Sequence, residues 1–175
     1  MKLLNCASVL TAVAMLSVPP IIAVEAAETA KAMLKDAKGE DMGSVSLKQT
    51  SAGVLLQLSL KGVPAGEHAF HIHAVGKCEP PGFESAGGHF NPGSAHHGLM
   101  SGPGHAGDMP NLHAPASGAL DLEVLNNAIT LDKDKPNSVL HPGGTAIIIH
   151  AGKDDYMSDP AGNAGGRIIC GVIDE

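Results

Sequence analysis

The sequence predicts an all-β fold, arranged as an antiparallel sandwich or barrel. Short runs in which apolar and polar residues alternate recur roughly every dozen residues, and turn-forming residues separate them. No segment has a helical repeat long enough for a helix that would be stable alone. Aromatic residues make up only 2% of the chain, so the core is expected to consist mainly of Val, Ile, Leu, Ala and Met.

Each predicted strand is bounded by residues that favour turns. The first run ends at a polar segment, residues 36–41, and a Ser-Ala-Gly turn over 51–53 separates the second run from the third. A Gly-Val-Pro-Ala-Gly turn over 62–66 follows the third run. The strands are expected at 32–35, 44–48, 54–60, 68–74, 119–124, 145–150 and 167–173.

One segment does not fit a sheet protein unless something organises it. Residues 75–117 contain nine Gly and six Pro and show no periodic pattern. Structureless loops of this length are uncommon inside a compact domain. Five histidines lie in the segment, and metal coordination would supply the organisation that the backbone pattern lacks.

The N-terminal segment, residues 1–26, is typical of a secretory signal peptide. Lys2 precedes a long apolar stretch, and Val24-Glu25-Ala26 places small residues at the positions that a signal peptidase inspects. Pro19-Pro20 would interrupt a membrane-spanning helix, with a retained membrane anchor as the alternative. Cleavage would leave residues 27–175 as one domain without a stable membrane anchor, exported to the periplasm or the extracellular space.

Export bears on the cysteines. Cys6 would leave with the signal peptide, so that Cys78 and Cys170 remain. An even pair of cysteines in an oxidising compartment suggests one disulfide, and two buried free thiols are the alternative.

The acidic balance of the chain excludes some classes of partner. Without Lys2 and Glu25, the 11 basic and 18 acidic residues become 10 and 17, and the net charge stays at −7. Such a charge argues against nucleic-acid partners and against anionic membrane surfaces. Arg167 is the only arginine in the sequence.

Two histidines two residues apart begin a candidate metal site. In a strand, residues i and i+2 point to the same face, so His71 and His73 can reach one ion. Phe70 and Ile72 would then turn to the opposite face. His150, at the end of an apolar run, offers a third imidazole. A nitrogen-rich set suits copper and also zinc, and histidines on a solvated strand face are the alternative.

A second group of candidate ligands lies in the long segment 75–117. His89, His97 and His105 are followed by Asp108. Three imidazoles and one carboxylate make a closed tetrahedral set for zinc, with no open position for a substrate. Zinc at this place would fix the segment and stabilise the fold, whereas a solvated His-rich loop is the alternative.

Four strings of residues together point to a family. They are His68-Ala-Phe-His-Ile-His73, Gly87-Gly-His-Phe-Asn-Pro92, His105-Ala-Gly-Asp108 and Gly162-Asn-Ala-Gly-Gly-Arg-Ile-Ile-Cys-Gly-Val-Ile173. In this order they resemble the copper/zinc superoxide dismutases over nearly the whole of 27–175. The resemblance implies a Greek-key β-sandwich or flattened barrel of about eight strands, with two long functional loops.

The resemblance also implies ligands for copper and zinc and a disulfide. Copper would be held by His71, His73, His89 and His150, and zinc by His89, His97, His105 and Asp108. His89 would therefore bridge the two metals. Cys78 and Cys170 stand where the family has its intrachain disulfide.

Charged residues near these ligands take expected roles from the same resemblance. Asp154 stands where the family has a carboxylate that hydrogen-bonds one copper histidine and one zinc histidine, with Asp155 as the competitor for this role. Arg167 stands where the family places an arginine beside the copper, and its charge would attract a small anion. Lys153 is expected to assist, with Lys77 as a further candidate.

The remaining histidines have other expected roles. His68 stands outside the alternation that aims at the ion, and it is expected to be a structural hydrogen-bonding residue. His96 neighbours His97 and is the alternative to it as a ligand. His113 and His141 are expected to face solvent.

The expected function is that of an enzyme, a superoxide dismutase that protects against oxidative stress outside the cytoplasm. Two superoxide anions and two protons would give dioxygen and hydrogen peroxide, with a redox-cycling copper and a structural zinc as cofactors. His89 would part from copper when copper is reduced and carry a proton to the product. Superoxide is the expected partner, and a homodimer is left open. An exported metal carrier and an adhesion domain with incidental histidines are the alternatives.

Overall fold

The computed structural model describes residues 28–100 and 102–175, so the predicted signal peptide lies outside the described residues. In the described part, no helix is long and apolar enough to cross a membrane. The chain there forms nine strands and one short 3-10 helix. They are β1 (Thr29–Asp36), β2 (Asp41–Thr50), β3 (Gly53–Leu60), β4 (Gly66–His68), β5 (Phe70–His73), η1 (Glu84–Ala86), β6 (Leu112–Ala114), β7 (Leu120–Asn126), β8 (Ala146–His150) and β9 (Arg167–Asp174).

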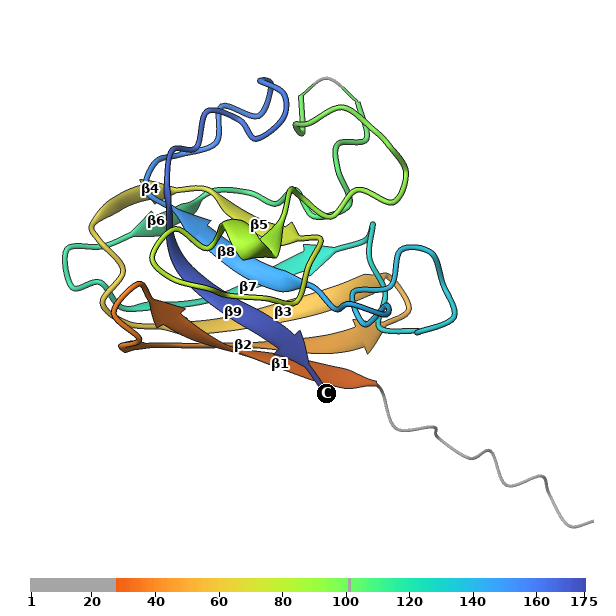
Figure 1. Ribbon diagram of the computed structural model, residues 1–175, viewed down its shortest axis with the longest axis horizontal. Helices are drawn as coiled ribbons and strands as arrows, with labels where there is room; N and C mark the ends of the chain where they lie inside the picture. Colours follow the sequence, from red (N-terminus) through yellow and green to blue (C-terminus); the bar gives the residue numbers. More distant parts are fainter. Residues whose placement is uncertain (1–27, 101) are drawn as a thin grey trace, which may run out of the picture.

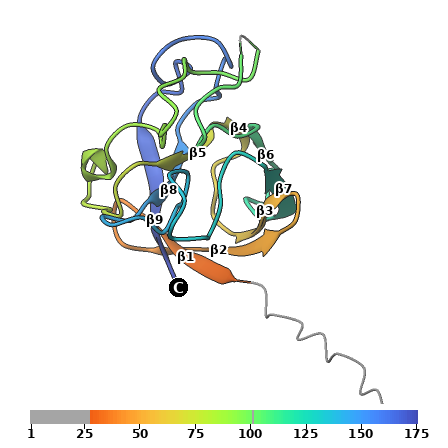
Figure 2. The same cartoon turned by 90° about the vertical axis from the view of Figure 1, so that its right-hand side faces the viewer.

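Seven of these strands form one antiparallel sheet in the order β5-β8-β9-β1-β2-β3-β7. The sheet curls strongly, so that the β5 end and the β7 end stand on opposite sides of an interior (Figure 2). β4 and β6 form a separate two-stranded antiparallel sheet. The prediction of an all-β antiparallel fold is confirmed, in the form of a half-barrel with a small second sheet.

Two details of the strands differ from the sequence prediction. The strand expected at 68–74 is divided at Ala69, because its N–H donates to Gly152 (2.8 Å) and its carbonyl accepts from His150 (2.9 Å). β4 on one side of this point therefore pairs with β6, and β5 on the other side pairs with β8. β6 lies within 75–117, where no strand was expected, since three residues are too few to show a period.

The main core lies inside the curl and is built from alternate residues of the strands. β1 buries Ala32 and Leu34, β2 buries Val45, and β3 buries Val54 and Leu56, all with no exposed surface. The residues between them are mostly exposed. Burial of one such Leu or Val side chain stabilises the fold by roughly 1.5–3 kcal/mol. The period of two that predicted these strands is thus the pattern that fills the core.

β8 is buried on both faces, which explains its continuous apolar sequence. Ile147 and Ile149 belong to the main core. Ala146 and Ile148 belong to a second, smaller cluster on the opposite face of the sheet, together with Phe83. This second cluster lies under the segment that the Cys78–Cys170 disulfide ties to β9.

The long segment 75–117 runs along the free edge of β5. Ile72 donates its N–H to the Gly107 carbonyl (2.9 Å) and accepts from the Phe90 N–H (2.8 Å), and Ala74 donates to Gly88 (2.9 Å). A side chain at Gly107 would overlap the Ile72 carbonyl oxygen. The segment thus stands where the next strand of the sheet would be, and it places Asp108 beside His71 and His89 beside His73.

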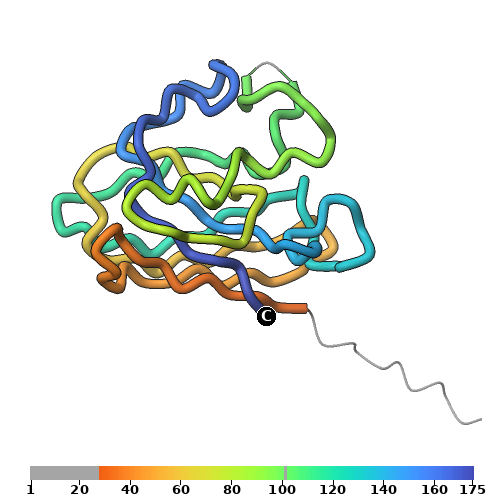
Figure 3. Tube along the Cα trace, viewed as in Figure 1, coloured from red at the N-terminus to blue at the C-terminus, as the bar shows by residue number. Residues whose placement is uncertain are grey.

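A second loop, residues 151–166, connects β8 to β9. The blue loop after β8 and the green part of 75–117 rise together above the same end of the sheet (Figures 1 and 3). The candidate ligands of the sequence analysis lie on β5, on β8 and on these loops, so the two loops cover the ends of the strands that carry His71, His73 and His150.

Candidate metal centre

β5 divides its side chains between the core and a buried polar site. Phe70 and Ile72 lie in the main core, and His71 and His73 point to the other face with 0% and 1% of their surface exposed. His150 is the third imidazole of that face, because it follows Ile149 in the alternation of β8, the antiparallel neighbour of β5. Period-two geometry therefore brings together the three histidines expected from the sequence.

Four imidazole nitrogens converge at this place, and His89 supplies the fourth. The atoms are His71 Nδ1, His73 Nε2, His89 Nε2 and His150 Nε2, and all lie within 4.8 Å of one another. Each is buried and has no hydrogen-bond partner among the described residues. Buried polar atoms without a partner are rare and costly in native proteins. A metal ion accepts all four lone pairs at once, so the four residues, called the first set here, fit a metal site.

The opposite nitrogen of three of these rings is held by an oxygen. His71 Nε2 donates to Asp154 Oδ2 (2.7 Å), His73 Nδ1 to the Gly87 carbonyl (2.9 Å) and His150 Nδ1 to the Gly165 carbonyl (3.1 Å). An oxygen acceptor requires the N–H on that side, which leaves the lone pair on the nitrogen that faces the site. These contacts fix both the tautomer and the direction of each ring before any metal binds.

Burial keeps the same rings neutral. It lowers the pKa of His71 to about 4, although the Asp154 hydrogen bond opposes the change. Burial also lowers the pKa of His73 to about 2 and that of His150 to about 3. At neutral pH no proton has to leave these three imidazoles before they coordinate a metal.

A second set consists of His89, His97, His105 and Asp108. Asp108 Oδ1 lies 2.8 Å from His89 Nδ1, 3.1 Å from His97 Nδ1 and 3.4 Å from His105 Nδ1. His105 Nδ1 lies 3.3 Å from His89 Nδ1. Ligand atoms about 2.0–2.1 Å from a tetrahedral zinc ion are about 3.3 Å apart. Three nitrogens and one oxygen at these separations fit zinc.

Asp108 is held as a carboxylate that keeps one oxygen for the second set. Its Oδ2 accepts from the backbone N–H groups of Gly98 (3.0 Å) and His105 (2.9 Å), which leaves Oδ1 for the imidazoles. Burial would raise the pKa of Asp108, but the hydrogen bonds from His89, Gly98 and His105 together lower it well below its ordinary range. The carboxylate is therefore negatively charged at neutral pH.

His89 belongs to both sets. Its Nε2 faces the first set and its Nδ1 faces the second, and its side chain is almost completely buried. The backbone bonds of Phe90 to Ile72 in β5 and of Gly88 to Ala74 just after β5 hold it between the two. Only an imidazole offers two nitrogen donors on opposite sides of one ring, so this residue can bridge two ions.

Asp154 joins the two sets from outside. Its Oδ2 accepts from His71 and its Oδ1 accepts from His97 Nε2 (3.0 Å). Burial raises its pKa, yet the bonds from His71, His97 and Tyr156 outweigh burial and lower the pKa to about 2. Asp155, the competitor from the sequence, is exposed and accepts from Ser158 and Asn163 instead.

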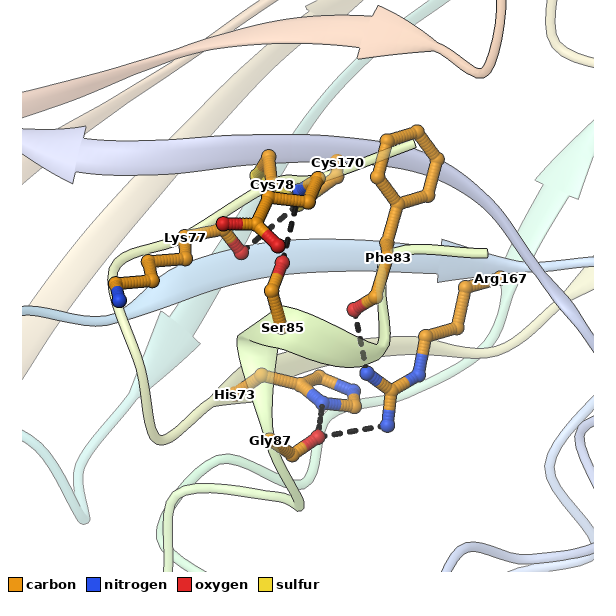
Figure 4. Close-up of a disulfide and its surroundings, with 9 residues drawn as sticks. His73, Lys77, Cys78, Phe83, Ser85, Gly87, Arg167 and Cys170 are labelled. Atoms are coloured by element: carbon orange, nitrogen blue, oxygen red, sulfur yellow. Dashed lines mark hydrogen bonds between the residues drawn. A yellow bond between two sulfur atoms is a disulfide. The ribbon is translucent and has the colours of Figure 1, made fainter. Parts of the chain in front are cut away.

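Arg167 lies at the start of β9 beside the disulfide (Figure 4). Its two terminal nitrogens donate to the carbonyls of Phe83 (2.7 Å) and Gly87 (2.6 Å). The Gly87 carbonyl also accepts from His73, so the guanidinium lies close to the first set. Cys78 and Cys170 are bonded as expected, with their Cα atoms 5.7 Å apart. The disulfide thereby anchors the segment that holds Arg167.

The histidines outside the two sets have other contacts. His68 is buried, and its ring nitrogens lie 2.8 Å from the carbonyls of His150 and Pro64, as a structural residue would. His96 is exposed and contacts Asp159, and His113 is exposed near Glu67.

The expectation that His141 faces solvent is wrong. It is half-buried, and its ring stacks on Phe90 with 5.5 Å between centroids. A single histidine after an apolar run shows no period from which this contact could be predicted.

Some partners of the site had no signal in the sequence. The carbonyls of Gly87 and Gly165 orient His73 and His150, but any residue supplies a carbonyl. Gly162 has a clearer reason: a side chain there would overlap Asp154 Oδ1 and crowd His97. Lys153, expected to guide an anion, lies 3.4 Å from Glu67, which offsets part of its charge.

Comparison with known proteins gives the same family for sequence and fold. The family model described as copper/zinc superoxide dismutase matches residues 42–173. The chain is 55% identical to superoxide dismutase [Cu-Zn] 1 of Aquifex aeolicus over 138 residues, which cover 78% of this chain and 82% of that protein. A superoxide dismutase-like protein from Bacillus subtilis superposes with a TM-score of 0.77 at 37% identity, covering 81% of this chain and 96% of the other. The copper/zinc superoxide dismutase of Brucella abortus superposes with a TM-score of 0.69 at 29% identity, covering 83% and 99%.

Proposed function

Since the chain belongs to the copper/zinc superoxide dismutase family, we propose that it converts two superoxide anions and two protons into dioxygen and hydrogen peroxide. The observation that carries the proposal is His89, whose two nitrogens face two different ligand sets. We assign copper to the first set and zinc to the second. Bound copper supplies one-electron redox chemistry, and zinc has none of its own. A metal carrier would need no shared ligand.

The imidazoles of the first set have a fixed direction and a fixed tautomer. Asp154 holds His71, and two backbone carbonyls hold His73 and His150. These three rings would not have to turn if a bound metal changed its charge, because an oxygen already holds the ring nitrogen that faces away from the site. This preorganisation keeps the energy of rearrangement low in both directions of a redox cycle.

His89 is the residue that can supply a proton at the reacting centre. Its Nδ1 remains in the second set, so the ring keeps its position while Nε2 is free to take up a proton. An imidazole suits this task because its surroundings can move its protonation across neutral pH. The second superoxide takes up two protons to leave as hydrogen peroxide; we assign one of them to His89 Nε2 and the other to solvent.

Arg167 is proposed to attract the substrate. The chain carries a net charge of −7, which repels a small anion. The Arg167 guanidinium is held near the first set by Phe83 and Gly87, so its charge stays at one place. The same charge lowers the pKa of His73 and His150, after the larger effect of burial. Lys153 is paired with Glu67. Lys77 is exposed, so water and salt screen its charge. We therefore assign the main attraction to Arg167.

We further propose that residues 1–26 are removed on export and that residues 27–175 act in the periplasm or the extracellular space. The Cys78–Cys170 disulfide supports an oxidising compartment. The N-terminal sequence supports the route. Mass spectrometry of the protein from its native compartment would give a chain that begins near Ala27. A mass that includes residues 1–26 would contradict the proposal.

Metal content and superoxide consumption, measured on the same purified sample, test the activity. We expect one copper and one zinc for each chain, and a superoxide decay in pulse radiolysis that rises in proportion to the copper content. A sample with both metals and no effect on the decay would leave only the metal-carrier function. The measurement therefore separates the enzyme from the carrier.

Replacement of Arg167 tests the attraction. Arg167→Ala should lower the rate constant for superoxide by about tenfold with unchanged metal content, and Arg167→Glu should lower it further, because the local charge is lost and then reversed. Added salt should slow the parent more than the Arg167→Ala protein, since salt screens the attraction. Equal rates for the parent and Arg167→Ala would remove Arg167 from the mechanism.

A further inference from the structure

Tyr156 is the only tyrosine of a chain without tryptophan. It lies in the loop 151–166, two residues after Asp154, and its backbone has a φ of 63°. Residues with a side chain rarely adopt this left-handed region, and those that do are held by their surroundings. Tyr156 is half-buried, and its contacts explain what holds it.

Each polar group of Tyr156 has a partner near the metal centre. Its N–H donates to Asp154 Oδ1 (2.6 Å), and its hydroxyl oxygen accepts from the Asn111 N–H (2.6 Å). Its carbonyl accepts from the Met100 N–H (3.4 Å). A side chain at Gly98 would overlap the same carbonyl oxygen, so that backbone contact requires glycine. Tyr156 thus ties its own loop to two distant points of the segment 75–117.

Asn111 completes the connection by holding the main chain of Asp154. Its Nδ2 donates to the Asp154 carbonyl (2.9 Å), and its Oδ1 accepts from the Asp154 N–H (2.8 Å). The backbone of Asp154 is therefore fixed by the Asn111 side chain, while the backbone of Asn111 is fixed by the Tyr156 hydroxyl. The three residues form a closed ring of hydrogen bonds.

The carboxylate in this ring is the one that orients both ligand sets. Asp154 Oδ2 accepts from His71 of the first set, and Asp154 Oδ1 accepts from His97 of the second set and from the Tyr156 N–H. The side chain of Asp154 is short, with only two rotatable bonds, so the direction of its carboxylate depends on where the backbone is held.

We propose that Tyr156 is a positioning residue for both metal sites. Through Asn111 its hydroxyl fixes the backbone of Asp154, and through its N–H it fixes one carboxylate oxygen. The proposal rests on the metal assignment made above, and it adds a residue that touches neither metal nor substrate. Loss of a partner that orients a metal-bound histidine typically lowers metal affinity 10–100-fold. Loss of one contact further out should fall near the lower end of that range.

The variant Tyr156→Phe removes only the hydroxyl and keeps the ring. Zinc affinity is measured by competition with a chromophoric chelator, on protein whose folding is verified by circular dichroism and whose disulfide is intact. We expect about a tenfold loss of zinc affinity. Ser158→Ala is the matched control, because it removes a hydroxyl from the same loop that contacts only Asp155 and Asn163. The control should stay within about twofold of the parent.

A spectroscopic measurement separates positioning from general stability. Cobalt(II) bound at the second set has a visible spectrum that depends on its ligand geometry. Tyr156→Phe should change the position and intensity of its bands, and Ser158→Ala should not. Equal zinc affinities and equal cobalt spectra for the two variants would overturn the proposal. Neither readout uses superoxide, so a parent protein without dismutase activity would end the proposed function and leave this test in force.

The parent protein provides a second measurement if Tyr156→Phe does not fold. With no tryptophan present, the tyrosine fluorescence of the described residues comes from Tyr156 alone. Zinc added to metal-free protein should change this fluorescence until the ligand sets are filled and then no further, because Asp154 and Tyr156 become fixed together. An emission that stays the same through the titration would contradict the coupling.

Discussion

The strands β1 to β3 and the two loops above them are held in place by different forces. The strands bury apolar side chains such as Leu34, Val45 and Leu56 completely, and every strand has antiparallel neighbours. The segment 75–117 adds Phe90, Met109 and Leu112 to the main core, and the loop 151–166 adds no residue to it. Backbone bonds to Ile72 and Ala74 also hold 75–117, and both segments are held by hydrogen bonds to carboxylates and by the two ligand sets, with the disulfide as a further link for 75–117.

Carboxylates accept several backbone N–H groups of the loops. Asp108 accepts from the N–H groups of Gly98 and His105, Asp155 accepts from those of Met157 and Ser158, and Asp159 accepts from that of His97. In the sheet, backbone N–H groups pair instead with the carbonyls of a neighbouring strand. We therefore expect the sheet to keep its structure through apolar burial, and the loops to depend more on the carboxylates, the disulfide and the ligand sets.

Removal of both metals should therefore separate the two regions. We expect hydrogen exchange in 75–117 and 151–166 to become at least about 100-fold faster, the factor for a ligand present at 100 times its dissociation constant. Exchange in β1, β2 and β3 should change less than about threefold, because their hydrogen bonds do not depend on the ligand sets. Mass spectrometry after peptide digestion measures both regions in one sample.

Zinc added back to this metal-free protein is the control, and it should restore protection in both loops. Equal acceleration of exchange in the sheet and in the loops would show one cooperative unit. That result would contradict the division into an apolar barrel and metal-dependent loops.

Reduction of the disulfide should have the next largest effect. Cys78 and Cys170 are 92 residues apart in sequence, and loop-closure entropy gives about 4–5 kcal/mol for a link of this length, as an upper value. We expect the free energy of unfolding to fall by about this amount or less in the Cys78→Ser/Cys170→Ser protein. Urea unfolding at equal metal content measures it.

The disulfide variant also tests whether the bond to β9 holds the segment around Phe83 and Gly87 in place. Because Cys170 lies in β9 and Cys78 lies in the segment that holds Arg167, the loss should also increase hydrogen exchange near Phe83 and Gly87. Unchanged exchange there would mean that the small cluster of Phe83, Ala146 and Ile148 holds the segment without the bond.

The two regions also differ in how far the sequence predicted them. Short runs bounded by turn residues predicted β1, β2, β3, β7, β8 and β9: most by alternation, the period that fills the core, and β8 by its continuous apolar sequence. It did not predict that 68–74 divides at Ala69, since that break depends on hydrogen bonds to residues 150–152. In the loops, the residue types and spacing predicted the set of His89, His97, His105 and Asp108, and the family resemblance added the bridging role of His89.

Most of the contacts that orient those ligands could not be predicted from the sequence. Asn111 and Tyr156 are ordinary loop residues by type, and their roles depend on two segments that meet in space. His141 was expected to face solvent and instead stacks on Phe90. Apolar burial leaves a periodic signal, but a hydrogen bond between distant loops leaves none.

A substitution in the core should destabilise the sheet and leave the metal sites in the loops unchanged. Leu56 is fully buried in the main core, and Leu56→Ala removes methyl groups and leaves a cavity. We expect the free energy of unfolding to fall by about 3 kcal/mol, within the range for such changes. Copper and zinc content should stay the same, because no ligand lies on β3. A variant that keeps its stability but loses zinc would contradict the comparison.

The smallest effect is expected for an exposed ion pair of the sheet. Lys61 Nζ lies 2.7 Å from Asp41 Oδ2, and both side chains are more than half exposed. Lys61→Ala should shift the urea midpoint by at most about a third of the shift of Leu56→Ala, because exposed pairs gain little in water. Lys48→Ala, on the exposed side of β2, is the matched control.

The contribution of this ion pair to stability should change with pH in one direction only. The hydrogen bond from Lys61 lowers the pKa of Asp41 below its ordinary value of 3.8, so the folded state favours the carboxylate. The contribution of the pair is therefore present above about pH 4 and is lost as the pH falls below it. In metal-free protein, where we expect the sheet to keep its structure, the difference between the parent and Lys61→Ala should be constant from about pH 7 to about pH 5 and should shrink toward about pH 3. A difference that grows in acid, or that appears only with zinc bound, would place this pair among the forces that hold the loops rather than those that hold the sheet.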